Sequence, residues 1–275
     1  MVKNKIVRQL KELVGHDYVA VLKRGNSAIN SAFSVVNKYK KVLIPAEGGW
    51  LHYKTASNMA GLNVVEVSCD DAKIDLHDLK EKLLTGEFGA LIYQNPGGYF
   101  AEQKVKRIKE LCSEFNCLVI LDVSGSLGTK LCSGKFADLV VGSFGKWKLV
   151  EAKVGGFISM SDKKLWDKLG KNLDLLNDDV SLLKINQKLN ELPERIRFLE
   201  GVRDKIVTDL LEQGKSIVSP DELGFVVLVK FTTDYEKDSI INYCQLHKYE
   251  WTECPRYIRL NEKAISIEVK RLQQN

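Results

Sequence analysis

Three features with useful chemistry stand where apolar, strand-like segments end. Gly25-Asn26-Ser27 opens a helical segment, Asp122 closes a nearly continuous apolar run, and Lys148 follows an apolar segment that ends near Ser143. Amides at a helix start bind anions, a buried carboxylate needs a cation or hydrogen bonds, and an amine adds to an aldehyde. Each feature also has an ordinary explanation when taken singly: a helix cap, a capping acid and a solvated lysine.

Taken together, the three features describe one ligand. It carries a phosphate for the helix start, a ring nitrogen for Asp122 and an aldehyde for Lys148. Pyridoxal 5'-phosphate has all three groups. The residues therefore predict a pyridoxal-phosphate site, provided that the surrounding elements bring the three positions together.

Those elements alternate along the first part of the chain. Expected strands cover 18–22, 41–44, 63–67, 90–93, 117–123, 139–144 and 156–160, with amphipathic helices between most of them. This alternation predicts an α/β fold, a mostly parallel sheet sandwiched by helices. Ligands bind such sheets at the carboxyl ends of the strands, so the three features should converge on one edge.

The pattern changes near residue 161. From there to about residue 213 the chain is charged and helical, and beyond it strands are expected at 225–231, 257–260 and 265–269, with a helix near 236–246. We therefore expect three parts: a large cofactor-binding α/β domain at 1–160, a helical connector at 161–213 and a small α+β C-terminal domain at 214–275.

Composition constrains the class of protein only broadly. The 275 residues include 41 Lys and Arg against 36 Asp and Glu, a net charge of +5. This mild excess permits an anionic or nucleic-acid partner but does not indicate one. No apolar run approaches the ~20 residues that span a bilayer, and the N-terminus has no apolar signal core, so we expect a cytoplasmic protein without a membrane partner.

The six cysteines predict no metal site. Cys112 and Cys117 stand five residues apart, but no second Cys or His pair follows at the spacing that zinc requires. In a reducing compartment we expect these thiols to be free and mostly to fill core space.

Two segments resemble the DegT/DnrJ/EryC1/StrS aminotransferases, which are fold-type I pyridoxal-phosphate enzymes. Residues 137–148, followed by Gly155-Gly156, are similar to that family's Ser-Phe-x-x-x-Lys…Gly-Gly signature, and residues 120–128 resemble its strand-end aspartate segment. The resemblance implies that Lys148 forms the Schiff base and that Asp122 pairs with the pyridine nitrogen. Lys146 is the alternative if the register slips by two.

The same resemblance implies the other contacts of the cofactor. Trp50 would stack on its ring, with His52 as the alternative, and Ser143 would add a hydroxyl at the phosphate. The family's glutamine three residues after the aspartate is replaced by Gly125, so its contact is expected from Ser124, Asn95 or His52. The expected cofactor-binding residues are Gly25, Asn26, Ser27, Ala28, Trp50, His52, Asn95, Asp122, Ser124, Ser143 and Lys148.

The expected activity is that of an aminotransferase-like enzyme. Lys148, freed by an incoming amine, would move the α-proton as the general base. An arginine could bind a substrate carboxylate bidentately, and related enzymes favour Arg259 over Arg256. The partners implied are a small-molecule amine and a second copy of the chain, in a homodimer with its active site at the subunit interface.

Two alternatives remain open at this stage. One is a pyridoxal-phosphate lyase, desulfurase or cysteine-forming synthase acting on a phosphorylated or tRNA-linked substrate, for which the basic charge is suitable and Cys132 is a candidate mobile thiol. The other is a shortened, non-catalytic homologue that binds the cofactor or a partner. The missing glutamine at Gly125 and the short chain favour this second alternative.

Overall fold

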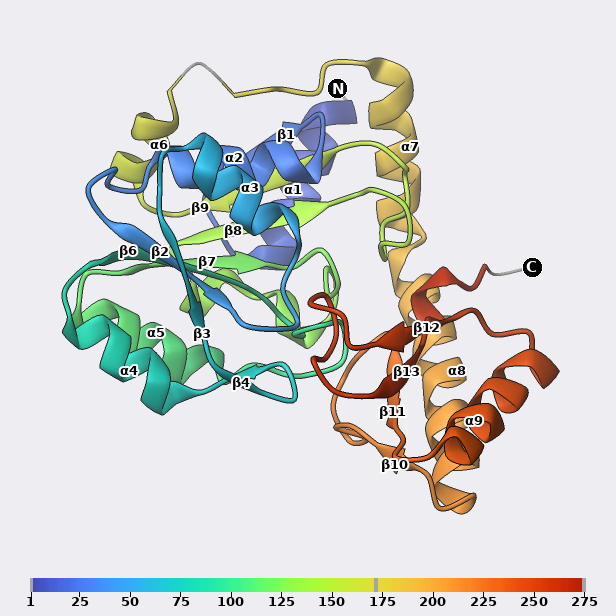
Figure 1. Cartoon of the computed structure of the whole chain (residues 1–275). Coiled ribbons are helices and arrows are strands. Elements are labelled where there is room, and N and C mark those ends of the chain that lie inside the picture. Colours follow the sequence, from blue (N-terminus) through green and yellow to red (C-terminus); the bar gives the residue numbers. More distant parts are fainter. Residues whose placement is uncertain (1, 171–172, 274–275) are drawn as a thin grey trace.

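The computed structural model describes residues 2–170 and 173–273, which form a large α/β domain and a smaller α+β region beside it (Figure 1). The sheet of the large domain has the strand order β1-β9-β8-β7-β6-β2-β3. Its strands are β1 (Tyr18–Leu22), β2 (Lys41–Pro45), β3 (Val64–Val67), β6 (Phe88–Gln94), β7 (Leu118–Asp122), β8 (Leu139–Ser143) and β9 (Gly156–Met160).

Most of these strands are parallel, as the sequence predicted. β2 pairs in parallel with β3 and β6, and the pairs β6–β7 and β7–β8 are also parallel. β9 lies between β1 and β8 and is antiparallel to both, so β1 runs in the same direction as β8. The carboxyl ends of β1, β6, β7 and β8 therefore lie at one edge of the sheet.

Helices cover both faces of this sheet (Figure 1). The helices α2 (Gly25–Ser34), α3 (His52–Met59) and α6 (Lys163–Leu169) pack on one face, and α1 (Val2–Val14), α4 (Leu76–Leu84) and α5 (Val105–Glu114) pack on the other. In β7, Ile120 faces the first group while Val119 and Leu121 face the second. A strand buried on both faces must be apolar throughout, which explains the continuous run in the sequence.

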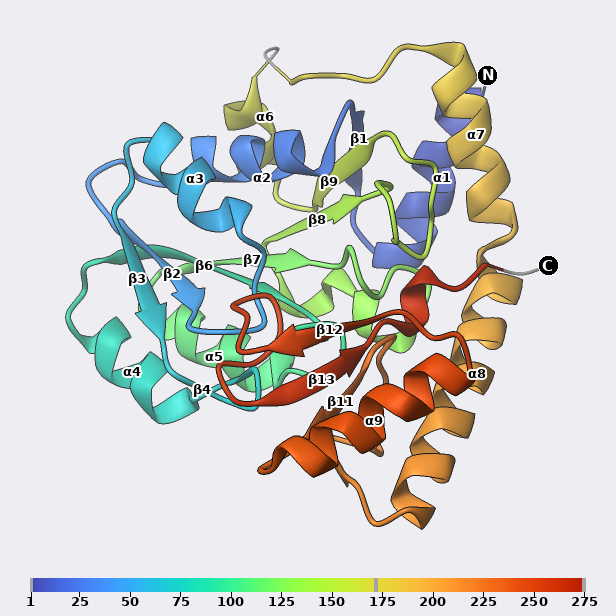
Figure 2. The same ribbon diagram turned by 45° about the vertical axis from the view of Figure 1, so that its right-hand side comes forward.

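The C-terminal part is built on an antiparallel sheet with the order β10-β11-β13-β12. Its elements are β10 (Ser216–Ile217), β11 (Val227–Lys230), α9 (Asp234–Leu246), β12 (Trp251–Cys254), β13 (Ala264–Ile267) and the short 3₁₀ helix η3 (Val269–Arg271). The helices α7 (Asp179–Asn190) and α8 (Leu192–Glu212) run along one side of both parts (Figure 2). A small hairpin, β4 (Cys69–Asp70) and β5 (Lys73–Ile74), completes the large domain.

One expected strand is wrong. Residues 257–260 form a turn in which Arg259 N donates to Arg256 O, and the strand is instead β12. Pro255 directly follows β12 and has no amide proton for a sheet hydrogen bond, so the strand ends there. The expected domain boundaries at 160/161 and 213/214 stay predictions.

Two searches of the described residues, 2–170 and 173–273, are negative. None of their helices is both long and apolar enough to cross a bilayer. No group of three or more His, Cys, Asp and Glu side chains among them converges as a set of metal ligands.

Candidate active site

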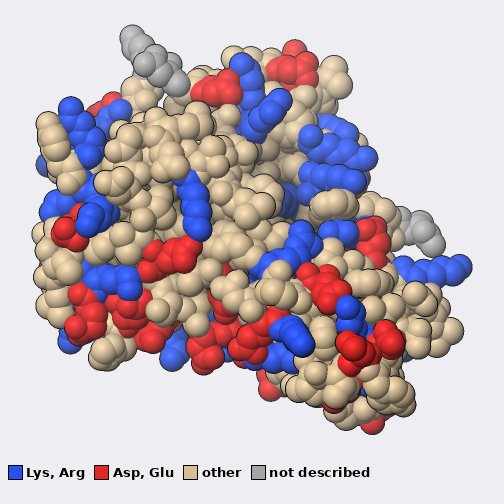
Figure 3. Space-filling model, viewed as in Figure 1, with Lys and Arg blue, Asp and Glu red and all other residues tan. Residues whose placement is uncertain are grey.

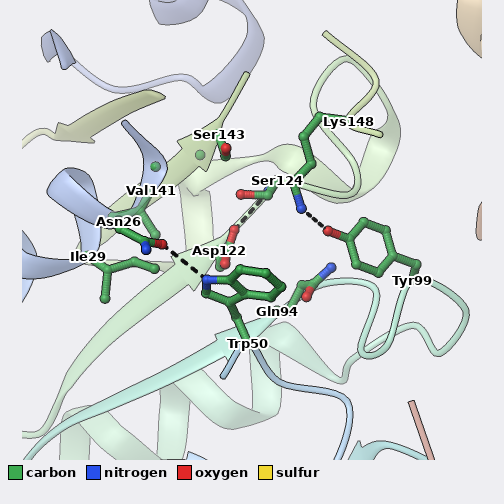
Figure 4. Close-up of a pocket in the computed structure, with 12 residues that line it drawn as sticks. Asn26, Ile29, Trp50, Gln94, Tyr99, Asp122, Ser124, Val141, Ser143 and Lys148 are labelled. Atoms are coloured by element: carbon green, nitrogen blue, oxygen red, sulfur yellow. Dashed lines mark hydrogen bonds between the residues drawn. The ribbon is translucent and has the colours of Figure 1, made fainter. Parts of the chain in front are cut away.

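Asp122 ends β7 at the bottom of a pocket between the strand tips (Figure 4). Its carboxylate is almost fully buried and accepts hydrogen bonds from the Tyr53 hydroxyl at 2.8 Å and the Ser124 amide at 2.9 Å. Burial and the neighbouring carboxylate raise the pKa of Tyr53 well above its usual value. Within the part of the chain that the structure describes, Asp122 forms no ion pair, although a buried carboxylate favours a cationic partner.

Lys148 reaches the same pocket from the loop between β8 and β9. Its ammonium group donates a hydrogen bond to the Tyr99 hydroxyl and lies 5.4 Å from the centre of the Trp50 ring (Figure 4). Lys146 lies over the ring of Trp147, at 4.1 Å, and lines a different cavity. Of the two lysines that the sequence left open, only Lys148 therefore contacts Asp122's pocket.

The start of α2 forms the opposite wall of the pocket. The N-cap residue Arg24 makes no side-chain capping hydrogen bond, so no N-cap side chain covers the start of the helix. A Cβ on Gly25 would lie 2.5 Å from the Ser143 Cβ, so glycine allows this helix start to approach β8 closely. Asn26 Oδ1 accepts a hydrogen bond from Trp50 Nε1 at 3.1 Å, which holds the indole beside the helix start.

We name this space the cofactor pocket. It is lined by Gly25, Asn26, Ile29, Trp50, Gln94, Tyr99, Asp122, Ser124, Val141, Gly142, Ser143 and Lys148. Its volume is about 50 Å³, because Lys148 and Tyr99 meet across it. A pyridine ring therefore requires this contact to open.

Gln94 is a pocket residue that the sequence analysis did not select. It ends β6 directly opposite Asp122 in the strand register and is 3% exposed, and its Nε2 has no hydrogen-bond partner among the described residues. The next residue, Asn95, was expected in the site but is bonded elsewhere: its Oδ1 accepts from Gln103 N and its Nδ2 donates to Leu131 O. Successive residues of a strand point to opposite sides, so Gln94 and Asn95 cannot both face the pocket. This alternation is the sequence signal that could have indicated Gln94.

Tyr99 is the other important residue that the sequence analysis missed. It lies in a turn after β6 with φ of +72°, and its ring fills the space above Gly125. A Cβ on Gly125 would lie 2.7 Å from that ring and 2.9 Å from Gln94 Nε2. The glycine that replaces the family's glutamine therefore leaves room for Tyr99 and Gln94.

Besides Asn95, three further expected cofactor contacts do not line the pocket. His52 Nε2 lies 2.9 Å from Asn30 Oδ1, and burial lowers the pKa of this histidine. The Ser27 hydroxyl donates to Asp174 at 3.0 Å, and Ala28 is buried in the core between α2 and the sheet. Ser27 and Ala28 therefore point away from the pocket, whereas Gly25 and Asn26 of the same helix start line it.

The two expected substrate arginines also lie outside the pocket lining. Arg259 is 2% exposed, and its guanidinium donates to both carboxylate oxygens of Glu268 at 2.9 and 2.8 Å and to Ser266 Oγ at 3.0 Å. Burial opposes the ionisation of Glu268, but the charges of Arg259 and Lys270 hold its pKa well below the usual value. Arg256 is exposed. Arg259 instead supports the pocket, since its guanidinium lies 5.2 Å from the centre of the Tyr99 ring.

Cys132, the candidate thiol of a desulfurase, also lies outside the pocket lining. Cys132 is 3% exposed, its Sγ donates to Leu13 O at 3.3 Å, and it belongs to the core cluster beneath α1. Burial raises the pKa of this thiol. Cys132 is thus packed as a structural cysteine.

Comparisons with known proteins agree with this architecture. A model of the DegT/DnrJ/EryC1/StrS aminotransferase family matches residues 3–174. The search of curated proteins finds no match. Among solved structures, the chain is similar to Helicobacter pylori PseC, described as an aminotransferase of pseudoaminic acid biosynthesis, with a TM-score of 0.81 and 14% identity over 98% of this chain and 85% of that one.

Two further structures have similar scores. The 3-amino-5-hydroxybenzoic acid synthase matches with a TM-score of 0.76 and 15% identity over 98% of this chain and 85% of that one. A chain of the complex of SepCysS with the SepCysE N-terminal domain matches with a TM-score of 0.74 and 17% identity, over 98% of this chain and 80% of that one. At such identities the likeness concerns the fold.

Proposed function

The chain belongs to the DegT/DnrJ/EryC1/StrS aminotransferase family, and from this premise we propose that Lys148 and Asp122 hold and operate its cofactor. Members of this family are pyridoxal-phosphate enzymes, so the chain is an aminotransferase-like enzyme that depends on that cofactor. The assignment of individual residues rests on the cofactor pocket.

Three groups of the pocket fit pyridoxal phosphate. The buried Asp122 carboxylate has hydrogen bonds but no ion pair within the described residues, which suits a protonated ring nitrogen. The amide of Gln94 has an unused donor for the ring hydroxyl oxygen. The uncapped start of α2, with Ser143 beside it, suits the phosphate. The unpaired Asp122 is the observation that carries the proposal.

Each side chain then has a defined task. Bound pyridoxal phosphate supplies an electron sink for the carbanion of the substrate. Lys148 would hold the cofactor through its amine and would move the proton at the α-carbon of the substrate. Asp122 keeps the ring nitrogen protonated in a site with little water, and Trp50 covers a ring face. Tyr99 would hold the lysine amine in the pocket through its hydroxyl until the cofactor enters.

We favour amino transfer over elimination or sulfur transfer. The family supports transfer, and Cys132 is packed in the core, which removes the observation that favoured a desulfurase. The amino donor is proposed to be a small-molecule amine such as an amino acid. A homodimer in the cytoplasm with the pocket at its interface also remains a proposal; light scattering of the purified protein tests the dimer.

The adduct on the lysine tests the proposal. Purified protein loaded with the cofactor should be yellow, and borohydride reduction followed by peptide mapping should place the label on Lys148. Lys148→Ala should lose the colour, while Lys146→Ala, two residues away, should keep it. A label on Lys146, or no coloured species in the wild type, would contradict the assignment.

The second half of the test separates the reaction types. An amino donor should convert the bound cofactor to its amine form and release a keto acid in equal amount. Release of pyruvate or sulfide without this conversion would favour the lyase or desulfurase alternative.

A further inference from the structure

A second cavity lies behind the loop that carries Lys148. Its volume is about 600 Å³, and it is bordered by the loop between β8 and β9, by α7 and by the start of α8. We name it the basic cavity, because five cations line it: Lys146, Lys153, Lys184, Lys188 and Arg195. Lysine and arginine gather over α7 and this loop at the surface (Figure 3).

Most of these cations have no carboxylate partner. Lys188 pairs with Glu191 at 2.8 Å, which accounts for one acid of the lining. Within residues 2–170 and 173–273, the other four cations form no ion pair. The remaining acid, Glu151, accepts a hydrogen bond from Gln273 Nε2 at 3.4 Å. The lining therefore has a positive charge that the described residues do not neutralise.

Arg195 is the most informative of the five cations. It is 9% exposed, and among the described residues its guanidinium makes a single hydrogen bond, from Nη2 to Lys270 O at 3.1 Å. Burial lowers the pKa of this guanidinium, and the charge of Glu151 only partly opposes that effect. A buried guanidinium has several donors to satisfy, and a bound anion would offset the cost of its burial.

The basic cavity is also coupled to the active-site loop. Lys146 and Arg271 lie on the ring of Trp147, each 4.1 Å from it, and Trp147 directly precedes Lys148. Lys146 and Trp147 line the basic cavity, whereas Lys148 lines the cofactor pocket. A ligand in the cavity would therefore contact the segment that positions the lysine.

We propose that the basic cavity binds a small ligand with two adjacent phosphate groups. One phosphate carries about −1.5 to −2 charges at neutral pH, so a diphosphate matches four unpaired cations and one acid better than a single phosphate does. The cavity lies within the range of roughly 300–1,000 Å³ that holds small ligands, so space remains for a group attached to the diphosphate. The inference is independent of the chemistry proposed at Lys148.

Calorimetry on the holoenzyme tests this proposal. With the cofactor bound, the start of α2 is occupied, so inorganic pyrophosphate should bind at the basic cavity alone. The double variant Lys153→Gln/Lys184→Gln, at two exposed positions, should weaken that binding about tenfold or more. The matched control, Lys80→Gln/Lys106→Gln, makes the same charge change at exposed positions of α4 and α5 and should bind like the wild type.

Three results would overturn the proposal. They are no pyrophosphate binding to the wild type, equal weakening in both double variants, and orthophosphate binding as tight as pyrophosphate. Adenosine diphosphate tests whether the natural ligand is free pyrophosphate or a larger molecule that carries a diphosphate. Tighter binding of adenosine diphosphate than of pyrophosphate assigns the cavity to the larger molecule. Equal binding assigns it to the free ion. The yellow colour of the bound cofactor is recorded for every variant. A failure of the proposed cofactor site is therefore distinguished from a failure of the basic cavity to bind pyrophosphate.

Discussion

Gln94 and Asp122 lie opposite each other at the ends of β6 and β7, and their side chains differ in the hydrogen bonds that they make with the protein. Both carboxylate oxygens of Asp122 accept a hydrogen bond from the protein, whereas the Gln94 Nε2 has no hydrogen-bond partner in the part of the chain that the structure describes. Both side chains are almost fully buried. A buried donor without a partner costs about 1–3 kcal/mol, which a ligand with an acceptor at that point would recover.

Gln94→Leu tests this relationship through two readouts of opposite sign. Without cofactor, the variant should unfold at the same or a higher denaturant concentration than the wild type, because it removes an unsatisfied buried group. Its affinity for pyridoxal phosphate should fall about tenfold, as one hydrogen bond to the cofactor is lost. A variant with reduced stability and unchanged affinity would show that Gln94 has only a structural role.

Asp122→Asn should separate cofactor binding from turnover. The asparagine oxygen can still accept from the Ser124 amide, and its Nδ2 can donate to the Tyr53 hydroxyl, so the fold and the yellow colour should persist. The rate of amino transfer should fall by about 10²–10³, the usual effect of removing one preorganised electrostatic group. Asp122→Ala is the contrasting variant: it leaves the buried Tyr53 hydroxyl without a partner and should lose about 1–3 kcal/mol of stability. Wild-type turnover in Asp122→Asn would contradict the role of the charge.

Gly125→Ala should disturb the pocket through sterics alone. The added methyl would lie 2.7 Å from the Tyr99 ring and 2.9 Å from Gln94, so we expect a loss of about 1–3 kcal/mol of stability and weaker cofactor binding. The matched control is Gly201→Ala, in the middle of α8 with no atom within 4 Å of the new methyl. That control should gain about 0.5–1 kcal/mol, because alanine favours a helix. Equal thermal shifts in the two variants would refute the packing argument.

Lys270 should make stability depend on pH. Burial, together with the charge of Arg259, lowers the pKa of Lys270 to about 7. Between that value and the ordinary lysine value of about 10.4, the folded protein holds fewer protons than the unfolded chain, so this group makes the free energy of unfolding rise with pH. The contribution is at most about 1.4 kcal/mol per pH unit.

Chemical denaturation from pH 7 to 10 measures this dependence. Lys270→Met should remove the rise, and Lys263→Met, at an exposed lysine, should retain it. The result is informative about the active site as well, since Lys270 lies 4.9 Å from the centre of the Tyr99 ring that contacts Lys148. Identical pH profiles for Lys270→Met and the wild type would exclude the lysine as the titrating group.

Local patterns determined much of this protein. The alternation of apolar runs and amphipathic segments predicted the parallel sheet, because period and burial are local properties of the sequence. The rule that ligands bind at the carboxyl ends of strands predicted that Gly25, Asp122 and Lys148 lie at one edge of the sheet, and all three line the same pocket. These positions needed no knowledge of which side chains face each other across the sheet.

Only the tertiary structure decided the rest. The direction in which a side chain points depends on strand register and on the residues packed against it, and these come from distant parts of the chain. The strand register places Gln94, rather than Asn95, in the pocket beside Asp122. The absence of a side chain at Gly125 leaves space for the Tyr99 ring. The pairing of Arg259 with Glu268 is also a tertiary contact: the guanidinium that the sequence analysis assigned to a substrate is bound by Glu268, which directly follows β13.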